Sequence, residues 1–396
     1  MITFEEAYRR IMLNTKDFGD EAVDLMKSTN RILAESIYAD RDFPPFDRAT
    51  KDGIAIKYES FEKGIPYFNV EGVVGAGMPQ QKLIGEENCL EIMTGAVLPH
   101  NTDTIVMYED VAIVDGFASI KSNPRKGQNI HKKGEDKKQG EVLLEKGIRI
   151  SPADIGVFAT VGKVEVLVKK LPKVCVISTG NELVDISETP LAHQIRTSNV
   201  LSLQTALASE NIHADHIHLL DDKKSITQKL TVALRDYDVL LLSGGVSKGK
   251  YDFIPEVLDD LGVDKVFHKV LQRPGKPMWF GRHESLKTAV FSFPGNPVST
   301  FANYHIYFLP WLYNSLGVEN ESEFVILDED VPNTTPLTLF IPVKTFWDKG
   351  TLMARKIENS GSGDLTCLAY SDGFVCLPPQ EIPYYRGLLV PYIPVK

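Results

Sequence analysis

The chain has 396 residues, of which 43% are hydrophobic, and a formal net charge of -10 at pH 7. Because a single hydrophobic core stops growing beyond roughly 250 to 300 residues, this length predicts several domains. The acidic balance excludes the broad basic surface that a nucleic-acid backbone requires, so a small-molecule substrate is the better expectation.

The amino terminus and the cysteines favour a cytoplasmic protein. Glu5 and Glu6 stand where a secretory signal would be basic and then apolar, and no run approaches the roughly 20 apolar residues of a membrane span. The four cysteines form no CxxC pair, so we expect free thiols in a reducing compartment.

The first half of the chain predicts helices that flank a β-rich insert. Thr3 and Glu6 fit a capping box, and a second helical stretch is expected over about 21–37. Between about 54 and 140, short apolar runs separated by Gly, Pro and Asn predict an all-β insert. Helix returns after Ser151-Pro152, because serine can cap a helix and proline fits its first turn.

From Leu171 to about Gly317 the sequence alternates strand, loop and helix. The unbroken apolar run from Val239 to Leu242 is typical of a strand buried on both faces, as in parallel sheets. This part therefore predicts a doubly wound α/β domain. After Glu321, β-like runs separated by Pro, Asn and Gly predict a small barrel or sandwich.

Four glycine-containing loops of the α/β part are candidates for an anion site. They are 178–182, 243–249, 273–277 and 294–299. If the apolar runs before them (174–177, 239–242, 266–271 and 289–293) are parallel strands, all four loops open at the sheet edge where such folds bind ligands. Glycine lets backbone N–H groups approach a phosphate closely. A single loop of this kind is a common turn, so the prediction of an anion site depends on the presence of four such loops at one edge of the sheet.

Charged residues beside these loops suggest what the anion site holds. The acidic ones are Glu182, Asp221, Asp222 and Asp252. Carboxylates next to a phosphate cradle are typical of Mg²⁺ sites, although helix capping would account for Asp222 and Asp252 equally well. Arg273 and Lys276 are candidate anion clamps, and Lys248 is either a third clamp or a solvated charge.

Three histidines, His213, His216 and His218, lie close together in the sequence and could suggest a metal site. Only His216 and His218 share a face of a strand, and nothing else there completes a ligand set. A packed or solvated role is therefore the expectation for them.

Taken in order, the motifs resemble the molybdopterin molybdenumtransferase family, the MoeA type that is shared with the gephyrin E domain. The resemblance covers nearly the whole chain. Its motifs are Asp52-Gly53-Ile54-Ala55, Ile92-Met93-Thr94-Gly95-Ala96, Gly134-Glu135-Asp136, Thr179-Gly180-Asn181-Glu182-Leu183, Ser243-Gly244-Gly245-Val246-Ser247, Pro274-Gly275-Lys276-Pro277 and Pro294-Gly295-Asn296-Pro297-Val298-Ser299.

This resemblance implies a multidomain α/β plus β architecture. Its parts would be a helical dimerisation region (1–45 and 141–170), a β insert domain (46–140), a central doubly wound α/β pterin-binding domain that holds molybdopterin (171–318), and a C-terminal β-barrel domain (319–396). Family members are homodimers whose active cleft lies between the α/β domain of one subunit and the β insert of its partner.

The resemblance also implies an activity in molybdenum cofactor biosynthesis. Such transferases take molybdate and adenylylated molybdopterin as substrates and insert the molybdenum, with Mg²⁺-dependent release of AMP. A transient contact with the molybdopterin adenylyltransferase is expected as well.

Site residues follow from the matched motifs. The implied catalytic residues are Asp52, Asp136, Glu182, Asp252 and Lys276. Asp221 and Asp252 would hold Mg²⁺. The implied substrate-binding residues are Thr94, Gly180, Ser243, Gly244, Gly245, Ser247, Arg273, Gly275, Pro294, Gly295, Asn296 and Ser299.

Two other functions compete with this one. The related adenylyltransferase shares the α/β domain, but its loop typically reads Thr-Gly-Gly-Thr-Gly where this chain has 243–247, and it lacks the flanking β domains. A non-catalytic scaffold of the gephyrin E-domain type need not retain Asp52, Asp136 and Asp252 together, and all three are present here.

Overall fold

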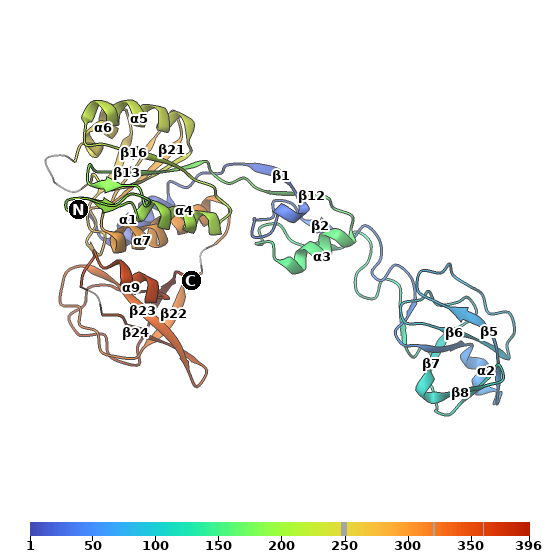
Figure 1. Cartoon of the computed structure of the whole chain (residues 1–396). Helices are drawn as coiled ribbons and strands as arrows, with labels where there is room; N and C mark the ends of the chain where they lie inside the picture. The colour runs from blue at the N-terminus through green and yellow to red at the C-terminus, as the bar shows by residue number, and fades with distance from the viewer. Residues whose placement is uncertain (247–251, 320, 359) are drawn as a thin grey trace.

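The computed structural model describes residues 1–246, 252–319, 321–358 and 360–396. The molecule is elongated: the α/β part and the C-terminal β part lie at one end, a small strand-and-helix segment lies in the middle, and the β insert lies at the other end (Figure 1). Within the described residues, no helix is long and apolar enough to cross a membrane. All four cysteines are free and buried.

The central α/β sheet has the strand order β16-β13-β17-β21-β20-β18. Its strands are β13 (Val174–Thr179), β16 (Asp215–Leu219), β17 (Val239–Ser243), β18 (Asp264–His268), β20 (Trp279–His283) and β21 (Thr288–Phe293). The first four in spatial order run parallel, and β13, β17 and β21 are buried along their whole length. This is the burial that their unbroken apolar runs predict.

The strand β20 is antiparallel to both of its neighbours, β21 and β18. Because it separates them, β18 runs in the same direction as β13, β17 and β21, so the strand expected over 266–271 is present with the expected direction at 264–268, although it pairs with no parallel neighbour. The segment from Lys269 to Met278 that joins β18 to β20 is too short for the crossover that a parallel pair needs.

Helices cover both faces of the central sheet, which makes it doubly wound. One face packs against α1 (Phe4–Met12), α4 (Asn199–Ser209), α7 (Pro297–Asn303), the π-helical turn η3 (Tyr304–Phe308) and α8 (Leu309–Ser315). The other face packs against α5 (Lys223–Asp236) and α6 (Ile254–Asp260). Alternate residues of β17 enter the two cores, with Leu241 in the first and Leu240 in the second.

The amino-terminal helix α1 belongs to this α/β core, although the resemblance places it in a separate helical region. Ala7 and Ile11 are fully buried in the core, and Ile2 bridges to Val270. Half of the predicted capping box forms, because the Thr3 hydroxyl accepts from the Glu6 N–H at 3.2 Å, whereas the Glu6 carboxylate accepts from Arg9 and Arg10 instead of from the N-cap backbone.

The middle segment is a small unit of strands and one helix. Its elements are β1 (Asp20–Asp24), the 3-10 turn η1 (Leu25–Lys27), β2 (Ile37–Tyr38), β11 (Val142–Leu144), α3 (Pro152–Thr160) and β12 (Glu165–Lys169). The helix expected over 21–37 is absent, because β1 pairs antiparallel with β12 along its whole length. The capping box of Ser151 with Asp154 starts α3 as expected. The four domain boundaries drawn from the sequence stay a prediction.

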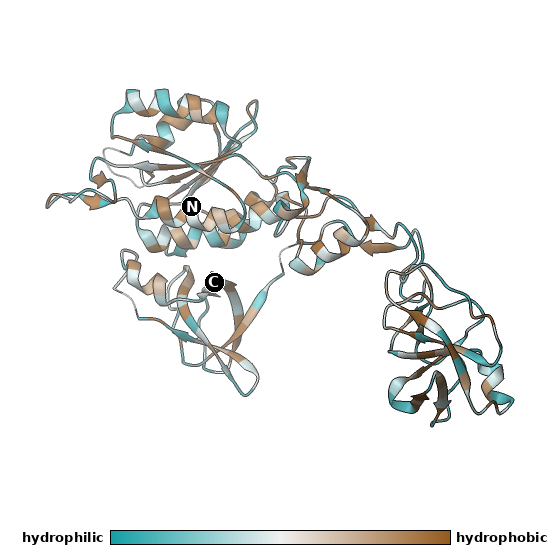
Figure 2. Ribbon diagram, turned by 45° about the vertical axis from the view of Figure 1, so that its right-hand side comes forward, coloured by the Kyte–Doolittle hydropathy of each residue, from teal (hydrophilic) through white to brown (hydrophobic). Residues whose placement is uncertain are grey.

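The insert is a six-stranded sheet in the order β7-β4-β6-β5-β9-β8. Its elements are β4 (Gly53–Ile56), α2 (Tyr58–Glu62), β5 (Phe68–Val74), β6 (Asn88–Ile92), β7 (Thr104–Met107), the 3-10 turn η2 (Tyr108–Asp110), β8 (Val111–Val114) and β9 (Phe117–Ile120). Figure 2 shows hydrophobic residues gathered on the strands of this sheet. At the base of the insert, β3 (Arg48–Ala49) pairs with β10 (Ile130–His131).

The C-terminal part is a closed five-stranded barrel. Its elements are β22 (Glu323–Leu327), β23 (Thr338–Asp348), β24 (Thr351–Lys356), α9 (Leu365–Tyr370), β25 (Gly373–Leu377) and β26 (Leu389–Pro394). The strands follow the order β23-β24-β22-β26-β25, and pairing of β25 with β23 closes the ring. Short β19 (Gln272–Arg273) adds to β23 and ties the barrel to the α/β part.

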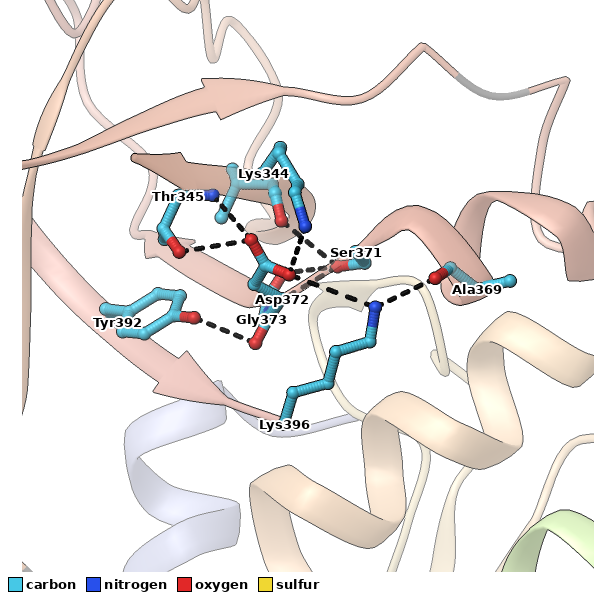
Figure 3. Close-up of polar contacts among 9 residues, drawn as sticks. Lys344, Thr345, Ala369, Ser371, Asp372, Gly373, Tyr392 and Lys396 are labelled. Carbon is cyan, nitrogen blue, oxygen red and sulfur yellow. Dashed lines mark hydrogen bonds and ion pairs between the residues drawn. The ribbon is translucent and has the colours of Figure 1, made fainter. Parts of the chain in front are cut away.

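Polar contacts around Asp372 fasten the closing strands of this barrel (Figure 3). Its carboxylate accepts from Lys344 Nζ at 2.6 Å and from Thr345 N at 2.9 Å, and Tyr392 donates its hydroxyl to the Asp372 carbonyl at 2.8 Å. Burial alone would raise the pKa of Asp372, but the bonds from Lys344 and Thr345 outweigh it and lower that pKa. The carboxylate is therefore held ionised where three strands meet.

Candidate active-site cleft

A cavity of about 580 Å³ lies at the carboxyl ends of β13, β17 and β21. The loops after these three strands line it together. The predicted site residues among its walls are Gly180, Glu182, Asp221, Ser243, Gly244, Gly245, Asp252, Gly295 and Asn296. This is the edge at which open parallel sheets bind ligands, so the convergence expected for three of the four loops is present.

Close packing of the strand ends explains why glycine occupies 244 and 245. Gly244 has φ +101°, and a Cβ there would lie 2.5 Å from Thr179 Oγ1. Gly245 has φ +73°, and its Cβ would lie 2.6 Å from Ile254 Cγ1. Both positions therefore exclude other residues, and without side chains they let a ligand approach the backbone closely.

Asn199 joins two of the loops and was missed by the sequence reasoning. It is the first residue of α4, and its Nδ2 donates to Ser243 Oγ at 2.9 Å and to the Gly295 carbonyl at 2.7 Å. Thr300 adds a bond of 2.6 Å from its hydroxyl to the Pro294 carbonyl. A polar residue at the start of a helix on this sheet edge is the signal that could have identified Asn199.

Three carboxylates, those of Glu182, Asp221 and Asp252, enter the same cavity. Asp221 exchanges bonds with Asn181: it accepts from the Asn181 N–H at 3.3 Å, and its own N–H donates to Asn181 Oδ1 at 3.1 Å. Asp222 instead caps α5 by accepting from the Ser225 N–H at 2.7 Å, so the capping alternative holds for it.

These carboxylates fit a cation that is shared with a phosphate. In the described part of the chain, no cluster of three or more His, Cys, Asp or Glu side chains is arranged to hold a metal by itself. Mg²⁺ is usually bound by one or two carboxylates plus water and substrate phosphates rather than by a complete protein cage. Asp221 and Asp252, two of the three carboxylates that line this cavity together with its glycines, are a donor set of that kind.

A second cavity, of about 740 Å³, lies between the α/β part and the barrel and shares Gly245, Gly295 and Asn296 with the first. Its other predicted residues are Arg273, Gly275, Lys276, Pro294 and Ser299. The barrel contributes Lys356, which the sequence reasoning missed. Among the described lining residues there is no carboxylate, so we call this the basic cavity.

The loop 273–277 lies in the segment that leaves the carboxyl end of β18, which runs in the same direction as β13, β17 and β21. Within this segment, β19 pairs with β23 of the barrel, a contact that the sequence did not predict. The loop therefore opens at the expected edge of the sheet, and its pairing with the barrel brings Arg273 and Lys276 to the basic cavity.

Three predicted residues, Asp52, Thr94 and Asp136, lie on or beside the insert, which is at the far end of the molecule from both cavities (Figure 1). Asp52 and Thr94 lie together: Asp52 Oδ1 accepts from the Thr94 N–H at 2.6 Å and from its hydroxyl at 2.8 Å. These two bonds, the backbone one first, hold the pKa of Asp52 below its ordinary value. Ser247 and Lys248 fall outside the described residues.

Two hydrogen bonds link Asp136 through His131 to Arg48 at the base of the insert. Arg48 donates to His131 Nδ1 at 3.2 Å, and His131 Nε2 lies 2.9 Å from Asp136 Oδ1. Because a guanidinium can only donate, the neutral imidazole carries its proton on Nε2 and donates it to Asp136.

Both strand histidines bond to one hydroxyl. His216 Nε2 and His218 Nδ1 each lie 2.9 Å from Ser178 Oγ. Partial burial lowers the pKa of both imidazoles. His216 is exposed and His218 half-buried, which is compatible with the packed or solvated role expected from the sequence.

Comparison with known proteins matches these parts in order. Residues 2–162 match the MoeA N-terminal region (domain I and II), 175–314 a probable molybdopterin binding domain, and 325–395 the MoeA C-terminal region (domain IV). The molybdopterin molybdenumtransferase of Synechocystis sp. is 39% identical over 397 residues, which are 99% of each chain. The chain belongs to the molybdopterin molybdenumtransferase family.

Further members of this family agree along the whole length. The Bacillus subtilis molybdopterin molybdenumtransferase is 31% identical and aligns with 100% of this chain and 94% of its own. Among solved structures, the molybdopterin biosynthesis moeA protein of Pyrococcus horikoshii superposes with a TM-score of 0.84 at 32% identity, covering 100% of this chain and 99% of its own. The family's fold, with its central α/β part and C-terminal barrel, is thereby confirmed.

Proposed function

We propose that this chain is a molybdopterin molybdenumtransferase that inserts molybdenum into adenylylated molybdopterin with Mg²⁺-dependent release of AMP. The observation that carries the proposal is the pair of adjoining cavities of opposite character. One has glycine loops and three carboxylates, and the other has three cations and no described carboxylate. A pyrophosphate with its cation suits the first, and a free oxyanion suits the second.

In the first cavity the backbone around Gly244 and Gly245, with Ser243 and Gly180, would hold the pyrophosphate and pterin phosphate. The Gly180 and Gly244 N–H groups already donate to the Leu219 and Phe293 carbonyls, so these two glycines would allow close approach of the phosphates rather than donate to them. The Gly245 N–H, which has no acceptor among the described residues, would be the backbone donor, and the Ser243 hydroxyl lies 2.9 Å from Asn199 Nδ2. Gly245, Gly295 and Asn296 form the wall shared with the basic cavity, which Pro294 lines on its own side, so the pterin would bridge the two.

Asp221 and Asp252 would hold Mg²⁺, and Glu182 would orient the pterin. When bound, the cation neutralises charge that develops on the phosphate oxygens during anhydride cleavage. The role of the protein is to place these carboxylates opposite the glycine backbone.

In the basic cavity Arg273 and Lys276 would attract molybdate. Arginine can bind an oxyanion in a bidentate manner, and lysine acts as a point charge. Both are exposed toward the cavity, and Ser299, which is 3% exposed, lies at its wall. Bound molybdate would then lie beside the pterin end of adenylylated molybdopterin.

Asp52, Thr94 and Asp136 would complete the cleft from a second copy of the chain. The insert that carries them lies at the opposite end of the molecule from the cavities of its own chain (Figure 1). A homodimer in which each insert faces the partner's α/β domain is therefore part of the proposal, as are a cytoplasmic location and a transient contact with the adenylyltransferase.

The test is incubation of the purified protein with adenylylated molybdopterin, Mg²⁺ and molybdate, with AMP release and molybdenum incorporation followed together. We expect both products in equal amounts. Formation of adenylylated molybdopterin from ATP would instead favour the adenylyltransferase, and neither reaction would favour a scaffold.

A further inference from the structure

Three fully buried polar side chains form a hydrogen-bonded network beneath the loop 273–277. Gln272, Asn303 and Tyr307 are each 0% exposed. The Tyr307 hydroxyl donates to Gln272 Oε1, and Gln272 Nε2 donates to Asn303 Oδ1 at 2.9 Å. Buried polar groups are costly unless they are paired, so these bonds determine how the two amides are oriented.

The loop rests directly on this network. Gln272 Nε2 also donates to the Pro274 carbonyl at 2.9 Å. A Cβ at Gly275, where φ is +85°, would lie 2.4 Å from Asn303 Oδ1, so only glycine fits above the amide. The Gly275 carbonyl accepts from the Met278 N–H at 3.1 Å.

Anchoring the carbonyls in this way leaves the adjoining N–H groups free. In a trans peptide the C=O and N–H bonds point in opposite directions. The Pro274 carbonyl accepts from Gln272 Nε2, and the Gly275 carbonyl accepts from Asn303 Nδ2 at 3.5 Å as well as from the Met278 N–H, so the N–H groups of Gly275 and Lys276 point away from these donors. Within the described residues neither N–H has an acceptor, and both residues line the basic cavity.

We propose that the Gly275 and Lys276 N–H groups form an oxyanion-binding pair, and that Gln272, Asn303 and Tyr307 are positioning residues that orient it. Two adjacent backbone donors suit a tetrahedral oxyanion, and the side chains of Arg273 and Lys276 supply the charge. The inference rests on the proposed function for its ligand, molybdate.

The discriminating variant is Tyr307→Phe, which leaves Gln272 Oε1 buried without a donor and frees the amide to turn away from Pro274. Loss of one hydrogen bond to an anion corresponds to about tenfold in affinity. We therefore expect KM and Kd for molybdate to rise about tenfold, with kcat and KM for adenylylated molybdopterin nearly unchanged.

Tyr304→Phe is the matched control. Tyr304 lies in the same π-helical turn and is equally buried, but its hydroxyl has no partner among the described residues. Removing that hydroxyl breaks no bond, so KM for molybdate should stay at the wild-type value. Equal KM for molybdate in the two variants would overturn the inference.

A measurement on the wild-type protein covers the case in which Tyr307→Phe does not fold. Hydrogen exchange of the peptide that contains Gly275 and Lys276 should slow when molybdate saturates the protein, and unchanged exchange would overturn the inference. The two proposals fail separately. A wild-type protein that inserts no molybdenum contradicts the function, whereas an active one with an unaltered Tyr307→Phe variant contradicts only the oxyanion pair.

Discussion

Replacing Gly244 by alanine tests whether the glycine wall of the first cavity is required by close packing. Gly244 closes β17 and donates its N–H to the Phe293 carbonyl at 3.0 Å, so it joins two of the three strand ends. A Cβ at this position would meet Thr179 Oγ1 at 2.5 Å and the Thr179 carbonyl at 3.2 Å. The hydroxyl can rotate away, but the carbonyl belongs to β13 and cannot.

Two costs add in Gly244→Ala. An alanine held at φ +101° costs about 1–2 kcal/mol because its Cβ crowds the backbone. The collision with Thr179 adds about 1–3 kcal/mol, as overpacking in a buried site does. The strand end must also shift, and a displacement of a binding group that approaches 1 Å lowers kcat/KM by roughly a hundredfold.

Gly147→Ala is the matched control, because Gly147 has φ +92° and nothing lies within 4 Å of its Cβ position. It carries the backbone cost without the collision. Unfolding can be followed by tryptophan fluorescence, since Trp279 and Trp311 are both buried in the α/β part. We expect Gly244→Ala alone to lose kcat/KM for adenylylated molybdopterin. Equal losses of stability and activity in both variants would refute the reasoning.

Three further predictions concern charge. Asp52→Asn should lower molybdenum incorporation by about a hundredfold without changing stability, because Asp52 is exposed; Asp115→Asn, also exposed on the insert, should change neither. EDTA should stop AMP release, which added Mg²⁺ restores, and should leave molybdate binding intact as measured by equilibrium dialysis. Asp372→Asn should destabilise the barrel by about 1–2 kcal/mol in chemical unfolding. Because the folded pKa of Asp372 is lowered, its contribution is present above the unfolded pKa and is lost as pH falls through the folded value, so wild type and variant should converge in strong acid.

The sequence predicts those helices and strands whose type is set by their own local pattern of residues. It does not predict those whose type is set by pairing with a segment far away in the chain. The apolar run at Val239 to Leu242 can form little but a buried strand, and it does. The stretch 21–37 has spacing compatible with a helix, but pairing of Asp20–Asp24 with Glu165–Lys169 makes its start a strand. A partner more than a hundred residues away leaves no trace in local periodicity.

The same limit applies to the site. Glycines that follow apolar runs identify Gly244 and Gly295 in the sequence, and at Gly244 the positive φ of +101° explains why glycine is needed. Asn199 carries only the weaker signal of a polar residue at a helix start, and Lys356 carries none, since the packing of α4 and of the barrel brings them to the cavities. The tie between β19 and β23, which delivers Arg273, is likewise a tertiary pairing.

The separation of the insert from both cavities leads to a test of how the cleft is completed. If Asp52 acts on the α/β part of a partner, a chain with Asp52→Asn and a chain with Gly244→Ala can complement one another. In a mixed dimer, the intact α/β part of the first faces the intact insert of the second, which restores one of its two clefts. Random pairing makes half of the dimers mixed, so co-expression should recover about a quarter of wild-type activity, although each variant alone is nearly inactive. A cleft built within one chain would give no recovery, because every chain in the mixture carries a defect.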